Sequence, residues 1–322
     1  MNELQILTKI GPFSVTAYGL LIAAGALAGG AAVCLQWRRR FGKLSDGALL
    51  LCGIVAVLAV FGARLVYCAT MVGTFAADYE EQGGLAYMLQ IWEGGYALYG
   101  AVIFGALGGW LFARKARMDA CTALDLLAPG AALALCFGRA AEFFTQQGIG
   151  TDVEDEALWF FPVAMEAEEG WWVMPVFAWE AIIALVIAVV LLLQKDGYPG
   201  RKAGNFIVFL GLSQIMMDSL RKDEFLRFGF VHFNQLAAAT TVLLVLILRE
   251  IRCRRAGAPK AWQNWRYILF VLGALMIIAI EFGLDKSTID NLTLYIVMAL
   301  TLVMMGFALQ KDRLDRAGGE AC

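Results

Sequence analysis

Repeated apolar runs of about 20 residues dominate this 322-residue chain. A run of that length suits a bilayer-spanning α-helix, because each helical residue adds about 1.5 Å. Hydrophobic residues make up 60% of the sequence and charged residues only 17%, which is atypical of a soluble domain. We therefore predict an all-α polytopic membrane protein with nine spanning helices, at about residues 12–34, 48–70, 95–113, 122–144, 173–194, 203–220, 231–248, 267–284 and 291–309.

The segments that connect these runs alternate in charge. Basic residues follow the first and third runs, at 38–43 and 114–117, whereas acidic residues follow the second and fourth, at 78–81 and 152–169. Because cytoplasmic loops are rich in Lys and Arg, we predict an outer N-terminus and a cytoplasmic C-terminus. The segment 221–227 is basic although it lies on the predicted outer side. This is typical either of binding to an anionic group or of snorkelling membrane anchors.

The runs group into a seven-helix membrane domain and a later helix pair. None of the seven Cys forms a C-x-x-C pair, so neither a disulfide framework nor a metal site is predicted, and no cofactor is implied. The predicted organisation is a domain at 1–250 with outer loops at 73–94 and 145–172, a basic linker at 251–265, an accessory helix pair at 266–310 and a cytoplasmic tail at 311–322.

Successive helices should cross the membrane in opposite directions. With these directions, the polar residues within the runs fall at a similar depth in the membrane. Arg139 and Glu142 stand three residues apart near the outer end of one run, and Gln214, Asp218 and Arg221 share one face of another. Arg139 with Glu142, or Asp218 with Arg221, could by itself be a structural ion pair. Ionisable groups at membrane depth, however, usually line a site. We therefore predict a polar site in the outer half of the bilayer. Its candidate residues are Tyr18, Arg64, Tyr99, Arg139, Glu142, Glu180, Gln214, Asp218, Arg221 and Gln235.

Short motifs around these residues follow one another in a recognisable order between residues 10 and 250. They are Tyr18-Gly19, Gly62-Ala63-Arg64-Leu65, Trp92-Glu93-Gly94-Gly95, Gly138-Arg139 with Phe143, Pro175 with Trp179-Glu180, Asp218 with Arg221, and Gln235-Leu236. In sequence and order they resemble the motifs of bacterial prolipoprotein diacylglyceryl transferases. The resemblance implies a multi-pass enzyme of the bacterial inner membrane. Its substrates would be phosphatidylglycerol and the signal peptide of a lipoprotein precursor, with no nucleic acid involved.

The chain departs from the family pattern at positions that carry function in the family. Tyr99 replaces a histidine and Gln214 replaces an arginine, while Glu142, Thr145 and Gln147 stand where the signature has Asn, Asn and Glu. The arginines at 64, 139 and 221 are then matched by acids at 142, 180 and 218, so the predicted site is formally neutral. A neutral site binds an anionic headgroup less well, because phosphate recognition relies on guanidinium groups.

The resemblance also implies roles for the candidate residues. A cysteine thiolate would attack a glyceryl carbon while Arg139 stabilises the leaving phosphate and Arg64 and Arg221 hold the headgroup. Tyr99 is a poor base at neutral pH, so Glu142 or Asp218 would take the thiol proton. Tyr18, Glu180, Gln214 and Gln235 would bind substrate.

Two other functions are alternatives to the predicted transferase function. One is a diverged homologue that binds lipid or lipopeptide in the outer half of the bilayer without catalysis. The other, a transporter, is disfavoured because the sequence shows neither paired half-chain similarity nor interrupted helices.

Overall fold

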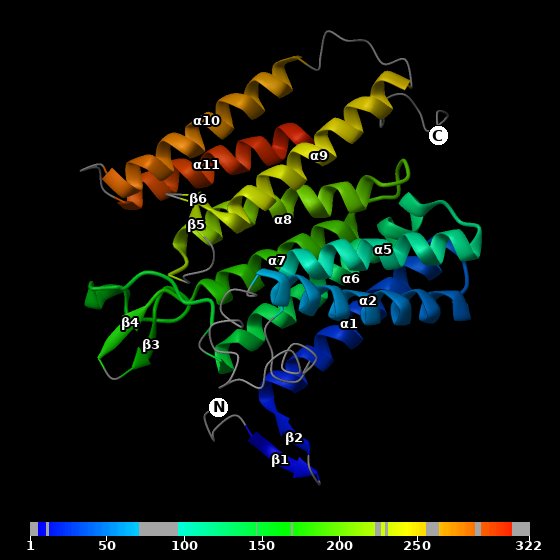
Figure 1. Ribbon diagram of the computed structural model, residues 1–322, viewed down its shortest axis with the longest axis horizontal. Coiled ribbons are helices and arrows are strands. Elements are labelled where there is room, and N and C mark those ends of the chain that lie inside the picture. The colour runs from blue at the N-terminus through cyan, green and yellow to red at the C-terminus, as the bar shows by residue number, and fades with distance from the viewer. Residues whose placement is uncertain are drawn as a thin grey trace. The chain divides into compact units, whose positions relative to one another are not determined.

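The computed structural model describes residues 6–10, 13–70, 96–145, 147–168, 170–222, 227–228, 231–255, 264–286 and 291–310. The predicted outer segment at 73–94, most of the linker and the tail at 311–322 fall outside these residues. Each predicted apolar run coincides with a helix in this part of the chain (Figure 1). The helices are α1 (Ala17–Phe41), α2 (Asp46–Thr70), α5 (Leu98–Ala116), α6 (Ala120–Ala141), α7 (Val176–Leu193), α8 (Arg201–Leu220), α9 (Phe233–Arg255), α10 (Asn264–Lys286) and α11 (Asn291–Gln310).

Six helical segments of the described chain are long and apolar enough to cross a membrane. This agrees with the predicted polytopic helical protein, while the total of nine spans and the orientation stay predictions. The six segments are Ala17–Phe41, Asp46–Thr70, Ala120–Phe144, Val176–Leu193, Arg201–Leu220 and Tyr267–Leu284, and a shorter apolar helix covers Thr293–Gly306.

The chain also contains short antiparallel hairpins that an all-α prediction omits. The first apolar helix begins at Ala17 rather than near residue 12, because β2 (Phe13–Thr16) pairs with β1 (Ile6–Ile10). Val15 and Thr16 are β-branched and therefore favour extended backbone. The other hairpins join β3 (Met165–Glu168) to β4 (Trp171–Val173) and β5 (Arg227–Phe228) to β6 (Val231–His232).

The described chain forms two compact units, and helices α1 and α6 each contribute residues to both. One unit comprises residues 30–127, in which α2 and α5 lie side by side (Figure 1). Its apolar core consists of Val33, Leu51, Phe112, Leu126 and Leu127.

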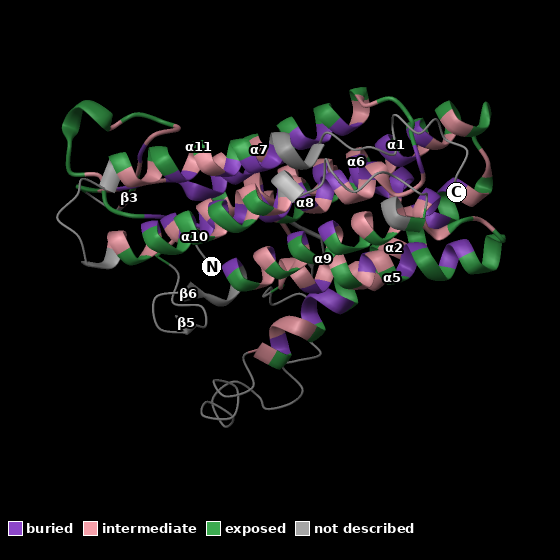
Figure 2. Cartoon of the chain, turned by 90° about the horizontal axis from the view of Figure 1, so that it is seen from above, coloured by how far each residue is buried: buried purple, intermediate pink, exposed green. Residues whose placement is uncertain are grey.

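The other unit comprises residues 1–29 and 128–322. Buried residues recur along α7 and α8 (Figure 2), and α8 packs against both α9 and α11. The first half of α1 closely approaches α6. A Cβ atom on Gly29 would lie 2.7 Å from the carbonyl oxygen of Gly130, so only glycine permits this contact. The approach anchors the part of α6 that precedes Arg139.

Candidate functional site

Arg139 lies in the last turn of α6 and contacts two carboxylates. Its Nη1 donates to Oε1 of Glu142 at 2.5 Å, and its Nε lies 3.3 Å from Oε2 of Glu180. Glu142 opens the 3₁₀ turn η3 (Glu142–Phe144), which continues directly from α6. The three-residue spacing on continuous helical backbone therefore brings Arg139 and Glu142 together.

Glu180 joins three helices at the centre of the cluster. Its side chain is only 2% exposed and lies in the second turn of α7. Oε1 accepts a hydrogen bond from Nε2 of Gln214 on α8 at 2.8 Å, and Oε2 lies 3.3 Å from Nη1 of Arg221. Because Arg139 also approaches Oε2, Glu180 interacts with three donor side chains. Such pairing and hydrogen bonding are what allow a carboxylate to be buried.

Arg221 completes a ring of alternating charges just beyond the end of α8. Its Nη2 lies 3.9 Å from Oε2 of Glu142, in addition to its contact with Glu180. The arginine side chains are 12% and 14% exposed, and that of Glu142 is 15% exposed. Two guanidinium groups thus face two carboxylates, so this ring of Arg139, Glu142, Glu180 and Arg221, hereafter the charged ring, is formally neutral.

A loop wall that the sequence analysis did not identify covers the charged ring. Gly148 has a φ of +67°, and a Cβ atom there would lie 2.4 Å from Oε2 of Glu142 and 3.4 Å from Nη2 of Arg221. The Gly148 carbonyl accepts the backbone N–H of Phe177 at 2.9 Å, which fixes the loop on α7. The Gly148-Ile149-Gly150 pattern was the available signal, since close backbone approach requires glycine.

The same loop is fastened to the end of α8. Gly150 forms an antiparallel bridge with Arg221, and Asp152 accepts a hydrogen bond from Nζ of Lys222 at 2.6 Å. Trp171 in β4 donates its Nε1–H to Asp152 at 2.8 Å. These hydrogen bonds, that from Lys222 first, lower the pKa of Asp152 below its ordinary value. Lys222, one of the basic residues noted on the predicted outer side, therefore pairs with an acidic loop residue.

Three other predicted residues lie in this unit outside the charged ring. Asp218 is buried on α8, and its carbonyl accepts the N–H of Arg221 at 3.4 Å. Gln235 is buried in the first turn of α9, where its Nε2 donates to the carbonyl of Ile215 at 3.1 Å. Tyr18 is half-buried at the start of α1. The substrate and proton-transfer roles of these residues stay predictions.

Arg64 and Tyr99 belong to the unit of residues 30–127. Arg64 is buried on α2, with its guanidinium 5.7 Å from the ring centre of Tyr67. The N–H of Ala97, two residues before Tyr99, donates to the carbonyl of Ala63 at 3.0 Å. Arg64 and Tyr99 therefore lie at the same end of the α2–α5 pair, and their participation in the site stays a prediction.

Sequence comparison adds evidence of ancestry to this geometry. The family model for prolipoprotein diacylglyceryl transferase matches residues 5–250. The chain belongs to this family. It is 27% identical over 260 residues to the phosphatidylglycerol–prolipoprotein diacylglyceryl transferase of Streptococcus uberis, covering 78% of this chain and 96% of the relative. A Streptococcus pneumoniae protein of the same name is 28% identical over 263 residues, covering 79% of this chain and 95% of the relative.

The transferase-family match includes the whole charged ring and ends before α10. The helix pair α10–α11 is therefore an addition to the matched domain. Within the described residues, no group of three or more His, Cys, Asp or Glu side chains is arranged to hold a metal ion.

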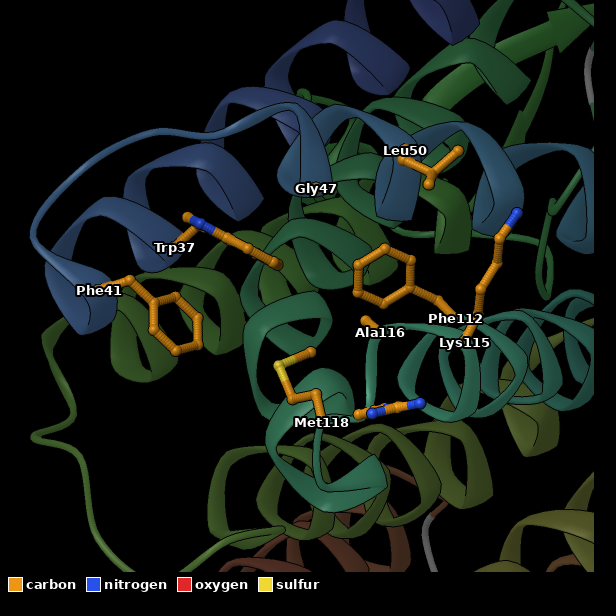
Figure 3. Close-up of a pocket in the computed structure, with 9 residues that line it drawn as sticks. Trp37, Phe41, Gly47, Leu50, Phe112, Lys115, Ala116 and Met118 are labelled. Carbon is orange, nitrogen blue, oxygen red and sulfur yellow. The ribbon is translucent and has the colours of Figure 1, made fainter.

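A cavity of about 570 Å³ lies in the other unit, between the end of α1, the start of α2 and the end of α5 (Figure 3). Trp37, Phe41 and Phe112 project around it, and Lys115 stands at its edge. Arg117 also lines the cavity. Cations at this position counter the partial negative charge of the α5 C-terminus. The basic residues are thus explained by helix electrostatics without a ligand. The cavity is lined by Trp37, Phe41, Gly47, Leu50, Phe112, Lys115, Ala116, Arg117 and Met118.

Proposed function

We propose that this chain is a phosphatidylglycerol–prolipoprotein diacylglyceryl transferase of the bacterial inner membrane. The observation that carries the proposal is the charged ring, in which two arginines face the buried carboxylate of Glu180 and the more exposed carboxylate of Glu142, in a member of the transferase family. The relatives' names supply the substrates, phosphatidylglycerol and a prolipoprotein. The outer N-terminus and nine spans predicted from the sequence form part of the same proposal.

In the proposed reaction the cysteine sulfur forms a bond to a glyceryl carbon of the lipid. The carbon–oxygen bond to the phosphate breaks, and its electron pair leaves with glycerol phosphate. Negative charge therefore grows on the phosphate side, where Arg139 stabilises it while Arg221 holds the headgroup. Arginine suits this role because its planar fork can bind two phosphate oxygens at once.

Glu142 is the better placed carboxylate to receive the thiol proton. Its side chain is 15% exposed, against 2% for Glu180, so a substrate reaches it more readily. Glu180 instead contacts Gln214 and both arginines, which makes it the anchor of the ring. Asp218, buried on α8, is the second candidate base carried over from the sequence analysis.

The neutrality of the charged ring has a cost for substrate binding. Each guanidinium already faces carboxylate oxygens, so a phosphate must displace or share those contacts. This observation also favours the alternative function, a diverged homologue that binds lipid or lipopeptide without transfer. The two functions differ in whether a thioether-linked diacylglyceryl group appears on a reporter.

The decisive experiment is rescue of a bacterial strain depleted of its own diacylglyceryl transferase. A reporter lipoprotein is analysed by mass spectrometry after expression of wild type, Arg139→Ala or Arg249→Ala. Arg249 is the matched control, because it is also an arginine in this unit but bonds Asn205 at 2.7 Å, away from the ring. We expect modified reporter with wild type and the control, and none with Arg139→Ala. An unmodified reporter with well-inserted wild-type protein would reject the transferase in favour of the lipid-binding alternative.

A further inference from the structure

The α10–α11 pair, which lies beyond the family match, is packed onto the helix that carries Gln214 and leads to Arg221. Met298, Leu302 and Met305 of α11 are buried, and α11 contacts α8 (Figure 1). Tyr295, one turn before Met298, packs against the core formed by Val176, Met217 and Leu220. Helix α11 therefore covers part of α8 near the charged ring.

Tyr295 reaches the last turn of α8 with its hydroxyl group. The O–H donates to the carbonyl oxygen of Ser219 at 3.3 Å. The last four carbonyls of a helix have no intrahelical donor, and an unpaired carbonyl is costly inside a membrane. Tyr295 thus satisfies a backbone acceptor two residues before Arg221.

Glu281 provides the second link, from α10. Its Oε1 accepts a hydrogen bond from Nε2 of Gln235 at 2.9 Å, and the same nitrogen donates to the carbonyl of Ile215 at 3.1 Å. Ile215 directly follows Gln214, whose side chain holds Glu180. A polar chain therefore runs from α10 through α9 to the backbone of α8 beside the site.

We propose that the α10–α11 pair is a positioning element that fixes residues 214–220 of α8, and with them Arg221 just beyond its end, relative to the rest of the charged ring. Tyr295 and Glu281 are its positioning residues, acting through the Ser219 carbonyl and through Gln235. The role in catalysis rests on the proposed transferase function. The role of the helix pair in holding α8 can be measured whether or not the protein is a transferase.

The test uses full-length protein in phosphatidylglycerol-containing nanodiscs. Tyr295→Phe removes only the hydroxyl, and Glu281→Leu removes the acceptor, whereas Glu281→Gln keeps an acceptor oxygen. Thr301→Val is the control, because the Thr301 hydroxyl bonds only the Val297 carbonyl of its own helix in the contacts that the structure describes. Hydrogen exchange of residues 214–222 is measured alongside kcat and KM for phosphatidylglycerol.

We expect Tyr295→Phe and Glu281→Leu each to accelerate exchange in 214–222 by about threefold, the effect of losing one interhelical hydrogen bond in a membrane protein. KM should rise by a similar factor of about three with little change in kcat, because Arg221 is assigned to headgroup binding. Glu281→Gln and Thr301→Val should resemble wild type.

Exchange in the two disruptive variants that matches Thr301→Val would overturn the proposal. So would faster exchange with an unchanged KM, since α8 would then be stabilised without any effect on the site. If wild type transfers no diacylglyceryl group, the transferase function fails separately. Exchange, together with phosphatidylglycerol binding measured by native mass spectrometry, then still decides whether the helix pair positions α8.

Discussion

Replacing Gly148 with alanine tests whether the loop wall shapes the charged ring. The residue has a φ of +67°, a conformation that costs an L-residue about 1–2 kcal/mol. The new Cβ atom would also lie 2.4 Å from Oε2 of Glu142, closer than the atoms can pack. The Glu142 carboxylate must then shift, which weakens its hydrogen bond to Arg139 and its ion pair with Arg221. A hydrogen bond to a charged group typically contributes about 1.5–3 kcal/mol. The expected total destabilisation is about 2.5–5 kcal/mol.

Gly170 offers a matched control for the backbone part of this effect. It has a φ of +77° in the turn between β3 and β4, and no atom lies within 4 Å of a Cβ atom built there. Gly170→Ala should therefore cost only the conformational part, about 1–2 kcal/mol. The difference between the two alanine variants isolates the contacts of the new methyl group, of which that with Glu142 is the shortest.

The assay is thermal unfolding in detergent at a fixed scan rate, combined with the transfer reaction. We expect Gly148→Ala to lower the apparent Tm by roughly 5–10 °C and Gly170→Ala by roughly 2–4 °C. Only Gly148→Ala should reduce kcat/KM, by about tenfold or more, because only it displaces a ring carboxylate. Equal effects of the two substitutions on Tm and on transfer would refute the assigned contact between the loop and the ring.

Three further substitutions separate the roles of the acidic residues. Glu142→Gln removes the charge that competes with phosphate, so KM for phosphatidylglycerol should fall by about fivefold or more; a KM that rises would contradict this competition. Glu180→Gln leaves the largely buried arginines undercompensated and should destabilise the protein by about 3 kcal/mol, unlike Glu166→Gln at an exposed position of β3. Equal apparent Tm values would argue against the anchor role. Because the pKa of Asp152 is lowered in the folded protein, its pair with Lys222 stabilises the loop above about pH 4. This contribution is below about 1 kcal/mol and is lost as the pH falls through the lowered pKa of Asp152. In wild type, hydrogen exchange of the loop, corrected for intrinsic rates, should therefore accelerate at low pH, and Asp152→Asn should abolish this acceleration. Retention of the wild-type pH dependence in Asp152→Asn would count against the pair.

Helix positions could be predicted from the sequence because apolar runs of spanning length leave the backbone few alternatives in a membrane. The same reasoning placed Arg139, Glu180 and Arg221 at one depth, and the structure brings these three side chains into contact. Depth alone carries no information on rotation about a helix axis. Arg221 lies just beyond the end of α8, and its described ion pairs run to Glu142 and Glu180 on other segments, while the participation of Asp218 in the site stays a prediction.

The remaining features depend on contacts between segments distant in sequence. Gly148 lies beside Glu142 because Phe177 of α7 and Arg221, just beyond the end of α8, bind the loop. Gln235 donates a hydrogen bond to Glu281, which lies 46 residues later in the chain and outside the family match. No local pattern around Gln235 could distinguish a substrate ligand from a bridge between helices.

The contacts of the charged ring also indicate which member must move during the proposed reaction. Two buried arginines without counter-charges would be costly in a membrane, so the carboxylates stabilise the ring while no lipid is bound. Glu180 is nearly inaccessible and contacts three donor side chains, whereas Glu142 is more exposed and lies in a short 3₁₀ turn after α6. An incoming phosphate can therefore replace Glu142 on Arg139 more readily than it can replace Glu180. The carboxylate released in that exchange lies beside the bound headgroup, where a base for the thiol is needed, so headgroup binding and activation of the base would be the same event.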